Sequence, residues 1–230
     1  MEKYFFIADL LGFSNMITNT SPEQRDKRID SWVQLVKEAK ANVNIEKTQL
    51  ISDTLFASAG STEGDLLKMI NFAQYLLNKG IERSLPIRGA ICFGEYVWGE
   101  LTYGKAVIKA HQLESKQNWI GVICDNNIPN IDTYSGTLLT CYPPPLKNSN
   151  FELYYVVNWD VPEFSKLIGL MVREGLTKTG EQISCDILDK INNTVEFSLY
   201  RKLINKHEIS ASKFVGYSPI NTIECMVDNK

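Results

Sequence analysis

The order in which strand-like and helix-like segments alternate constrains this chain most strongly. Residues 4–9 are an apolar run typical of a buried strand, and residues 20–41 place apolar side chains at helical spacing. Further along, the patterns predict two short strands within 49–58, a helix over 65–80, and two strands joined by a glycine-containing turn within 85–100. This β-α-β-β-α-β order predicts an α+β fold with a ferredoxin-like core.

Local signals set the expected ends of the two helices. Thr20 and Glu23 match a capping box at the start of the first helix, and Gly80 marks the end of the second. Apolar stripes over 29–36 and 66–77 would give each helix one buried face.

The second half of the chain changes from mixed to helical. The predicted elements are a helix over 104–116, strands over 119–125 and 151–159, a proline-rich loop at 143–145, and helices within 163–176 and 183–206. We therefore expect a domain over 1–160 and a helical C-terminal extension over 161–230 that packs on the same domain.

Composition and charge exclude several classes of protein. A hydrophobic content of 44% in 230 residues is ample for a core, and a net charge of -3 gives no general basic field for nucleic acid. The five cysteines contain no CxxC pair and the two histidines cannot form a zinc cluster, so we expect reduced thiols. No signal-peptide pattern and no membrane-length apolar run is present. We expect a cytoplasmic protein without nucleic-acid or membrane partners.

The first predicted strand ends on a carboxylate, Asp9, which a buried strand would not carry without a reason. Asp9 could cap the helix that follows, or it could hold a cation at the strand tip. A second aspartate, Asp53, falls at the tight turn of the predicted hairpin, where Asp is also common for local reasons. The two residues taken singly leave both interpretations open.

Four segments in sequence order resemble the catalytic domain of class III nucleotidyl cyclases. They are "DLLGFS" (9–14), "ISDTLFA" (51–57), "IRGAICFGE" (87–95) and "YGKAVIKAHQLES" (103–115), and the resemblance covers roughly residues 4 to 125. It implies that 1–160 is a cyclase catalytic domain, whose substrate is a nucleoside triphosphate.

The resemblance implies a site that holds two Mn²⁺ or Mg²⁺ ions. In a ferredoxin-like sheet the strands that carry Asp9 and Asp53 are neighbours, so their carboxylates can converge, and a divalent cation would relieve their repulsion. By similarity, the backbone carbonyl of Leu10 would complete the protein ligands. The turn that includes Gly12, Phe13 and Ser14 would cradle the phosphates with its amide groups at a helix N-terminus.

Two pairs of positions depart from the purine cyclases. The positions that read a purine base hold Gln49 and Leu101, which match neither the adenine nor the guanine pattern. The family's transition-state Asn and Arg fall on Ile108 and Gln112, and neither supplies a cation. The candidate replacements are Lys105, Lys109 and Arg88, although exposed lysines more often line a solvated helix face.

The segment "GKAVIKAHQLES" is most similar to the bacterial pyrimidine cyclases of the Pycsar anti-phage systems. The matching positions are Gly104, Lys105, Ala110, Leu113 and Glu114. This resemblance implies conversion of UTP, or next CTP, into a cyclic nucleotide that a separate effector protein reads. A purine cyclase with altered base recognition, and an inactive nucleotide-binding regulator, remain as alternatives.

The family resemblance also implies a homodimer with the catalytic site at the subunit boundary. Each chain contains one copy of each motif, so a composite site needs two chains. Trp98, Tyr103 and the aromatic first strand are of the residue types enriched at interfaces, although they could equally fill the core of a monomer.

Overall fold

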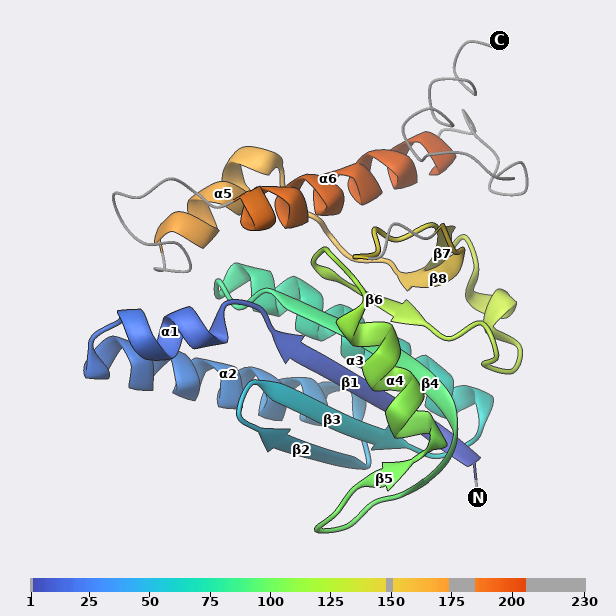
Figure 1. Ribbon diagram of the computed structural model, residues 1–230. Helices are drawn as coiled ribbons and strands as arrows, with labels where there is room; N and C mark the ends of the chain where they lie inside the picture. The colour runs from blue at the N-terminus through green and yellow to red at the C-terminus, as the bar shows by residue number, and fades with distance from the viewer. Residues whose placement is uncertain (1, 148–150, 174–184, 206–230) are drawn as a thin grey trace, which may run out of the picture.

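The computed structural model describes residues 2–147, 151–173 and 185–205, and its central feature is one mixed β-sheet (Figure 1). Strands β1 (Glu2–Leu10), β2 (Lys47–Ile51), β3 (Thr54–Ala59) and β4 (Ile87–Val97) are antiparallel in the order β2-β3-β1-β4. This order confirms the predicted α+β fold and its ferredoxin-like core.

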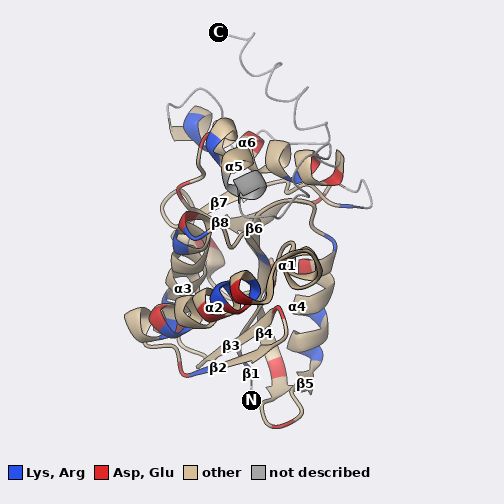
Figure 2. Cartoon of the chain, turned by 90° about the vertical axis from the view of Figure 1, so that its left-hand side faces the viewer, with Lys and Arg blue, Asp and Glu red and all other residues tan. Residues whose placement is uncertain are grey.

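Helices cover both faces of the sheet, as Figure 2 shows edge-on. α2 (Pro22–Val43) and α3 (Glu63–Glu82) pack together on one face, and α4 (Lys105–Ser115) packs on β1 and β4 from the other. The short α1 (Phe13–Asn19) follows β1 directly.

The first strand is buried on both faces, which explains its unbroken apolar run. Phe6 points toward α3, where its ring centroid lies 5.7 Å from that of Phe72, and its neighbour Phe5 points toward the opposite face. Both rings are fully buried within the single chain. The expectation that the aromatic first strand serves an interface between chains is therefore wrong, because these rings form the core.

The sheet continues beyond the ferredoxin-like core through β4. The added strands are β5 (Tyr103–Gly104), β6 (Gly121–Cys124), β7 (Leu139–Tyr142) and β8 (Tyr154–Val157), with a short 3-10 helix over Ile131–Tyr134. β6 runs parallel to β4, β8 and β7 follow antiparallel, and β5 forms a hairpin with the end of β4. The pattern did not predict β7.

Three local predictions were wrong. No turn interrupts 87–97, because β1 pairs with β4 along its whole length and Gly94 only admits Ala106 of α4 at close range. α3 continues past Gly80, whose missing side chain leaves room for the Leu85 carbonyl, 2.7 Å from an added Cβ. The N-cap of α2 is Ser21, whose hydroxyl accepts a hydrogen bond from the Gln24 amide, so the predicted Thr20–Glu23 box is not formed.

The C-terminal helices pack on the far end of the same sheet. α6 (Cys185–Asn205) lies over β6, β7 and β8, and α5 (Phe164–Arg173) packs beside α6 (Figure 1). In α6 the Thr194 hydroxyl accepts a hydrogen bond from the Ile120 amide, and the Phe197 ring meets Trp119 edge-on at 5.1 Å. Parts of the predicted helices (174–176, 183–184 and 206) and the rest of the extension to residue 230 lie outside the described residues.

Within the described ranges, no helix combines the length and the apolar character that crossing a membrane requires.

Candidate active site

The sheet brings Asp9 and Asp53 together at one of its ends. Asp9 is the penultimate residue of β1 and pairs with Thr54, the first residue of β3. The β2–β3 hairpin turns in only two residues, with Ser52 at a φ of 59°, and the Leu10 amide donates a hydrogen bond to the Asp53 carbonyl at 3.2 Å. The predicted convergence of the two aspartates is therefore what the fold produces.

The environment of Asp9 disfavours its charged form in the metal-free protein. Burial raises the pKa of the Asp9 carboxyl to about 6, and the negative charges of Asp53 and Glu114 add to this effect. The Asp53 side chain is close enough to share a hydrogen bond with Asp9. A divalent cation bound between the two carboxyl groups would relieve the repulsion between their charged forms.

The donor set fits a hard divalent cation. Carboxylate oxygens and a backbone carbonyl are the protein ligands that Mg²⁺ and similar ions accept, with remaining positions left to water and phosphate. Leu10, the last residue of β1, lies between the two aspartates in the hydrogen-bonded register. Among the described residues no group of three or more His, Cys, Asp or Glu side chains forms a self-sufficient metal site. Ions held here would therefore depend on further oxygen ligands, such as those of a substrate phosphate.

The predicted phosphate-binding turn follows the carboxylates directly. Gly12, at a φ of 82°, is the N-cap residue of α1, and Phe13 and Ser14 form its first turn. The Leu11 amide donates to the Pro86 carbonyl at 2.9 Å, which fixes the turn against the start of β4.

Arg88 stands opposite Asp9 in β4, and it is already paired. One of its terminal nitrogens, Nη2, lies 3.9 Å from Asp9 Oδ2. The same nitrogen and Nε contact Glu114 Oε1 at 2.6 and 2.7 Å, and Nη1 donates to the Gln117 carbonyl at 3.0 Å. The structure therefore places Arg88 at the same end of the sheet as Asp9 and Asp53, inside a buried ion pair.

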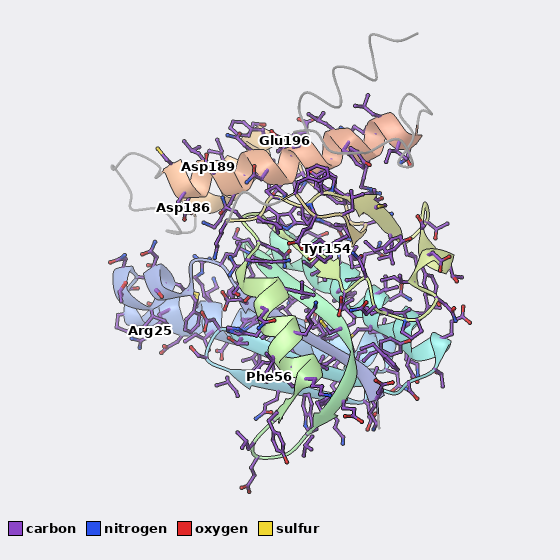
Figure 3. The ribbon with its side chains drawn as sticks, turned by 45° about the vertical axis from the view of Figure 1, so that its right-hand side comes forward. Arg25, Phe56, Tyr154, Asp186, Asp189 and Glu196 are labelled. Atoms are coloured by element: carbon purple, nitrogen blue, oxygen red, sulfur yellow. The ribbon has the colours of Figure 1, made fainter. Side chains whose placement is uncertain are left out.

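Gln49 lies on the same face of the sheet as Asp9, opposite Phe56 in β3. Phe56 is labelled in Figure 3. Its Oε1 atom is buried and accepts no hydrogen bond from any described residue. The ring of Phe56 lies 5.6 Å from Phe5, which in turn contacts Tyr96 at 5.1 Å. A polar atom without a partner thus sits beside an aromatic surface.

Lys105 lies at the start of α4, toward the opposite end of the sheet, and Lys109 lies one turn further along the helix. They line a cavity of about 410 Å³ together with Glu2, which is seven residues, or about 23 Å of strand, from Asp9. Lys109 Nζ is 3.9 Å from Asp125 Oδ1. Within one chain the predicted catalytic lysines and the predicted metal ligands are therefore not brought together.

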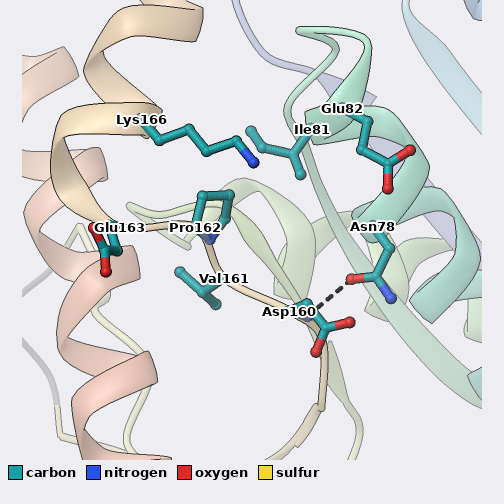
Figure 4. Close-up of a pocket in the computed structure, with 8 residues that line it drawn as sticks. All are labelled: Asn78, Ile81, Glu82, Asp160, Val161, Pro162, Glu163 and Lys166. Carbon is teal, nitrogen blue, oxygen red and sulfur yellow. Dashed lines mark hydrogen bonds between the residues drawn. The ribbon is translucent and has the colours of Figure 1, made fainter.

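Two other positions that the family resemblance singled out are exposed to solvent. Leu101, in the loop between β4 and β5, is 71% exposed, and Ile108 on α4 is 60% exposed. A larger cavity of about 610 Å³ lies between α3 and the segment that enters α5, around Asn78, Asp160 and Lys166 (Figure 4). It shares no residue with the carboxylate pair.

The sequence patterns missed the role of Glu114. Glu114 was one of the residues that matched the pyrimidine cyclase segment, but nothing in its neighbours indicated that it would reach Arg88, 26 positions earlier. The available signal was a carboxylate on the apolar side of the helix, one position after Leu113.

No protein-family model and no curated protein matches the sequence. Solved structures do match. The catalytic core of a rhodopsin-guanylyl cyclase with converted specificity, in complex with ATPαS, superimposes with a TM-score of 0.55 at 17% identity and covers 68% of this chain and 95% of that one. The adenylyl cyclase CyaB from P. aeruginosa gives 0.51 at 15% identity, with 69% and 95% covered.

The guanylyl cyclase domain of the RhoGC fusion protein from the aquatic fungus Blastocladiella emersonii gives the same picture. Its atypical dimeric form matches with a TM-score of 0.54 at 15% identity and covers 68% of this chain and 95% of that chain. Its monomeric form matches equally well, with a TM-score of 0.54 at 16% identity and coverages of 68% and 94%. At these identities the likeness concerns the fold, and in its fold the chain is similar to the adenylyl and guanylyl cyclase domains of class III.

Proposed function

We propose that the protein is a metal-dependent nucleotidyl cyclase, which converts a nucleoside triphosphate into its 3′,5′-cyclic nucleotide and pyrophosphate. The observation that carries this proposal is the convergence of Asp9 and Asp53 at one sheet end of a cyclase-like fold. Their carboxylates are the right chemistry to hold divalent cations beside a triphosphate.

Asp9, Asp53 and the Leu10 carbonyl would hold the ions, two Mn²⁺ or Mg²⁺ by the family resemblance. When bound, such ions favour the alkoxide of the ribose 3′-hydroxyl and neutralise charge on the triphosphate. The contribution of the chain's own residues would be to hold the triphosphate in place beside the carboxylates. The turn at Gly12 lies next to the carboxylates and would receive phosphate oxygens on its free amide groups.

We propose a pyrimidine substrate, UTP in preference to CTP. The buried Gln49 Oε1 atom has no hydrogen-bond partner in the described part of the chain, and uracil N3–H or the cytosine amino group could donate a hydrogen bond to it. The side-chain NH₂ group of Gln49 could in turn donate to an acceptor on the base. Leu101 offers no hydrogen bond to a purine edge. The similarity of "GKAVIKAHQLES" to pyrimidine cyclases supports the same substrate class, and the preference for UTP rests on the family's commoner product.

The separation of Lys105 and Lys109 from the carboxylates supports a homodimer, because a second chain could supply its lysines to the carboxylates of the first. Val97, Leu101, Tyr103 and Ile108 form exposed apolar positions around β5 and the outer side of α4. Residues of this kind, collected on one hairpin and the helix that follows it, suit burial against a second copy.

We extend the resemblance to the biological role: the cyclic nucleotide would be a second messenger of anti-phage defence that a separate effector protein reads. Two alternatives are kept. A purine cyclase is compatible with the same fold, and the absence of the family's Asn and Arg, replaced by Ile108 and Gln112, favours an inactive nucleotide-binding regulator.

A four-substrate assay separates these possibilities. Purified protein is incubated with each labelled nucleoside triphosphate and Mn²⁺, and the products are resolved by chromatography. We expect cyclic UMP or cyclic CMP from the wild type, none from Asp9→Ala, and wild-type yields from Asp30→Ala, which removes an exposed carboxylate on α2. Cyclic AMP or cyclic GMP as the main product would overturn the substrate class, and no product from any triphosphate would favour the regulator.

A further inference from the structure

Glu114 is a buried carboxylate at the C-terminal end of α4. Only 7% of its side chain is exposed, and its partner Arg88 is 9% exposed. Oε1 of Glu114 accepts a hydrogen bond from Arg88 Nε at 2.7 Å and forms an ion pair with Arg88 Nη2 at 2.6 Å. Since buried charges are costly to desolvate, a buried ion pair of this kind needs an explanation beyond stability.

The anchoring of α4 does not provide that explanation, because neutral hydrogen bonds already perform it. The side-chain amide of Gln117, just beyond the helix, donates to the carbonyls of Gly89 in β4 and Leu113 in α4, both at 2.9 Å. Its oxygen accepts from the Trp119 indole at 2.8 Å, and the residue is fully buried. These contacts tie the end of α4 to the sheet without any charge.

The position of Arg88 relative to Asp9 suggests another purpose. Three contacts of 2.6 to 3.0 Å hold the guanidinium toward Glu114 and the Gln117 carbonyl, whereas its approach to Asp9 stops at 3.9 Å. A free guanidinium would form a direct charge-assisted bond with the Asp9 carboxylate, at roughly 2.7–2.9 Å. That bond would occupy a carboxylate oxygen and would place a positive charge where a divalent cation must bind.

We propose that Glu114 is a positioning residue: it holds Arg88 away from Asp9 and balances its charge, so that the guanidinium neither occupies the Asp9 carboxylate nor repels a metal ion. This inference rests on the proposed function, because it assumes that Asp9 and Asp53 bind a divalent cation.

The test measures the binding of Mn²⁺ alone to the full chain, from the electron paramagnetic resonance signal of the free ion, with folding checked by circular dichroism. We expect Glu114→Gln to weaken Mn²⁺ binding by about tenfold or more, since an unbalanced unit charge a few ångströms away strongly opposes a cation at protein-like dielectric constants. The double variant Arg88→Gln/Glu114→Gln removes both charges and should recover affinity to within about threefold of the wild type by the same reasoning. Glu38→Gln is the control, because it breaks the Glu38–Arg83 pair between α2 and α3 and leaves the site intact.

The outcomes are separable. Wild-type affinity in folded Glu114→Gln, or a double variant as weak as Glu114→Gln, overturns the inference, because a purely structural pair gives no recovery. If Glu114→Gln does not fold, the double variant decides alone: affinity near wild type supports the inference and a tenfold loss overturns it. If Asp9→Ala binds Mn²⁺ as tightly as the wild type, the metal site itself fails, and the proposed function fails with it.

Discussion

At the scale of single residues, the negative charge of Asp9 is unfavourable in the metal-free protein, whereas the proposed metal site requires it. The Asp9 carboxyl group lies close to Asp53, and its Oδ2 atom is 3.9 Å from Arg88 Nη2. The raised pKa of this carboxyl group shows that the metal-free fold disfavours its negative charge. A residue that costs stability while serving a site is expected where function selects the residue.

Asp9→Asn should therefore stabilise the metal-free protein at pH 7. The folded-state pKa is about 6 against an ordinary value of 3.8, so the folded state holds this proton more tightly than the unfolded state does. The charged residue then lowers the free energy of unfolding progressively as the pH rises from about 4 to about 6, and the loss is complete above that window. We expect the variant to exceed the wild type by about 1–3 kcal/mol at pH 7, since one pKa unit corresponds to about 1.4 kcal/mol.

Urea unfolding in a chelator, at pH 4 and pH 7, measures this difference. The advantage of Asp9→Asn should shrink at pH 4, where the wild-type carboxyl is protonated in the folded state and partly protonated in the unfolded state. An advantage of equal size at both pH values would show that the carboxylate's charge is not responsible.

At the scale of elements, α4 depends on the residue from which it starts. Gly104 is the N-cap residue of α4 and the end of β5, with a φ of 144°, and an added Cβ would lie 2.5 Å from Tyr96 Cα and 2.6 Å from the Glu95 carbonyl oxygen. No side chain fits between α4 and the paired end of β4.

Gly104→Ala should lower the free energy of unfolding by about 2 kcal/mol or more, because both backbone strain and a backbone clash are introduced. The matched control is Gly99→Ala in the same hairpin loop, where the nearest atom, the Leu101 carbonyl oxygen, is 3.8 Å away. Thermal or urea unfolding of the two variants checks the prediction. Equal stabilities would contradict it.

The elements predicted from the sequence were those whose signals are local. The Asp53 hairpin follows from a tight turn between two short strands, and α4 follows from helical spacing after a glycine. The sequence could not indicate that Gly94 would stay within β4, since pairing with β1 overrides its turn preference. Nor could it indicate β7, whose four residues pair with β8 at the edge of the sheet.

In the candidate site, too, local motifs predicted some residues, whereas other contacts are seen only in the folded chain. Motif order identified Asp9 and Asp53 because neighbouring strands bring their ends together. The link between Arg88 and Glu114 joins a strand to a helix across a tertiary contact, which no local pattern encodes. The distance between the lysines and the carboxylates likewise became visible only in the folded chain.

At the scale of the whole molecule, the proposed homodimer predicts that two inactive variants can complement each other. Mixing inactive Asp53→Ala protein with inactive Lys105→Ala/Lys109→Ala protein should restore part of the wild-type activity. Each mixed dimer would contain one site with intact carboxylates from one subunit and intact lysines from the other.

Recovered cyclase activity, with subunit exchange followed by native mass spectrometry, is the measurement. Each variant alone serves as its own control. If exchange occurs and activity does not return, either the site lies within one chain or the lysines act on the same side as the carboxylates.

The length of α4 has a consequence for how this protein can vary. The eleven residues of α4 run from just after Gly104 to the end where Glu114 is tied to β4, so the length of the helix fixes the distance between its two attachments to the sheet. One inserted residue would turn everything before it by about 100° relative to that anchor. Insertions and deletions should therefore accumulate in exposed connections such as residues 99–101, between β4 and β5, and leave the length of this helix unchanged.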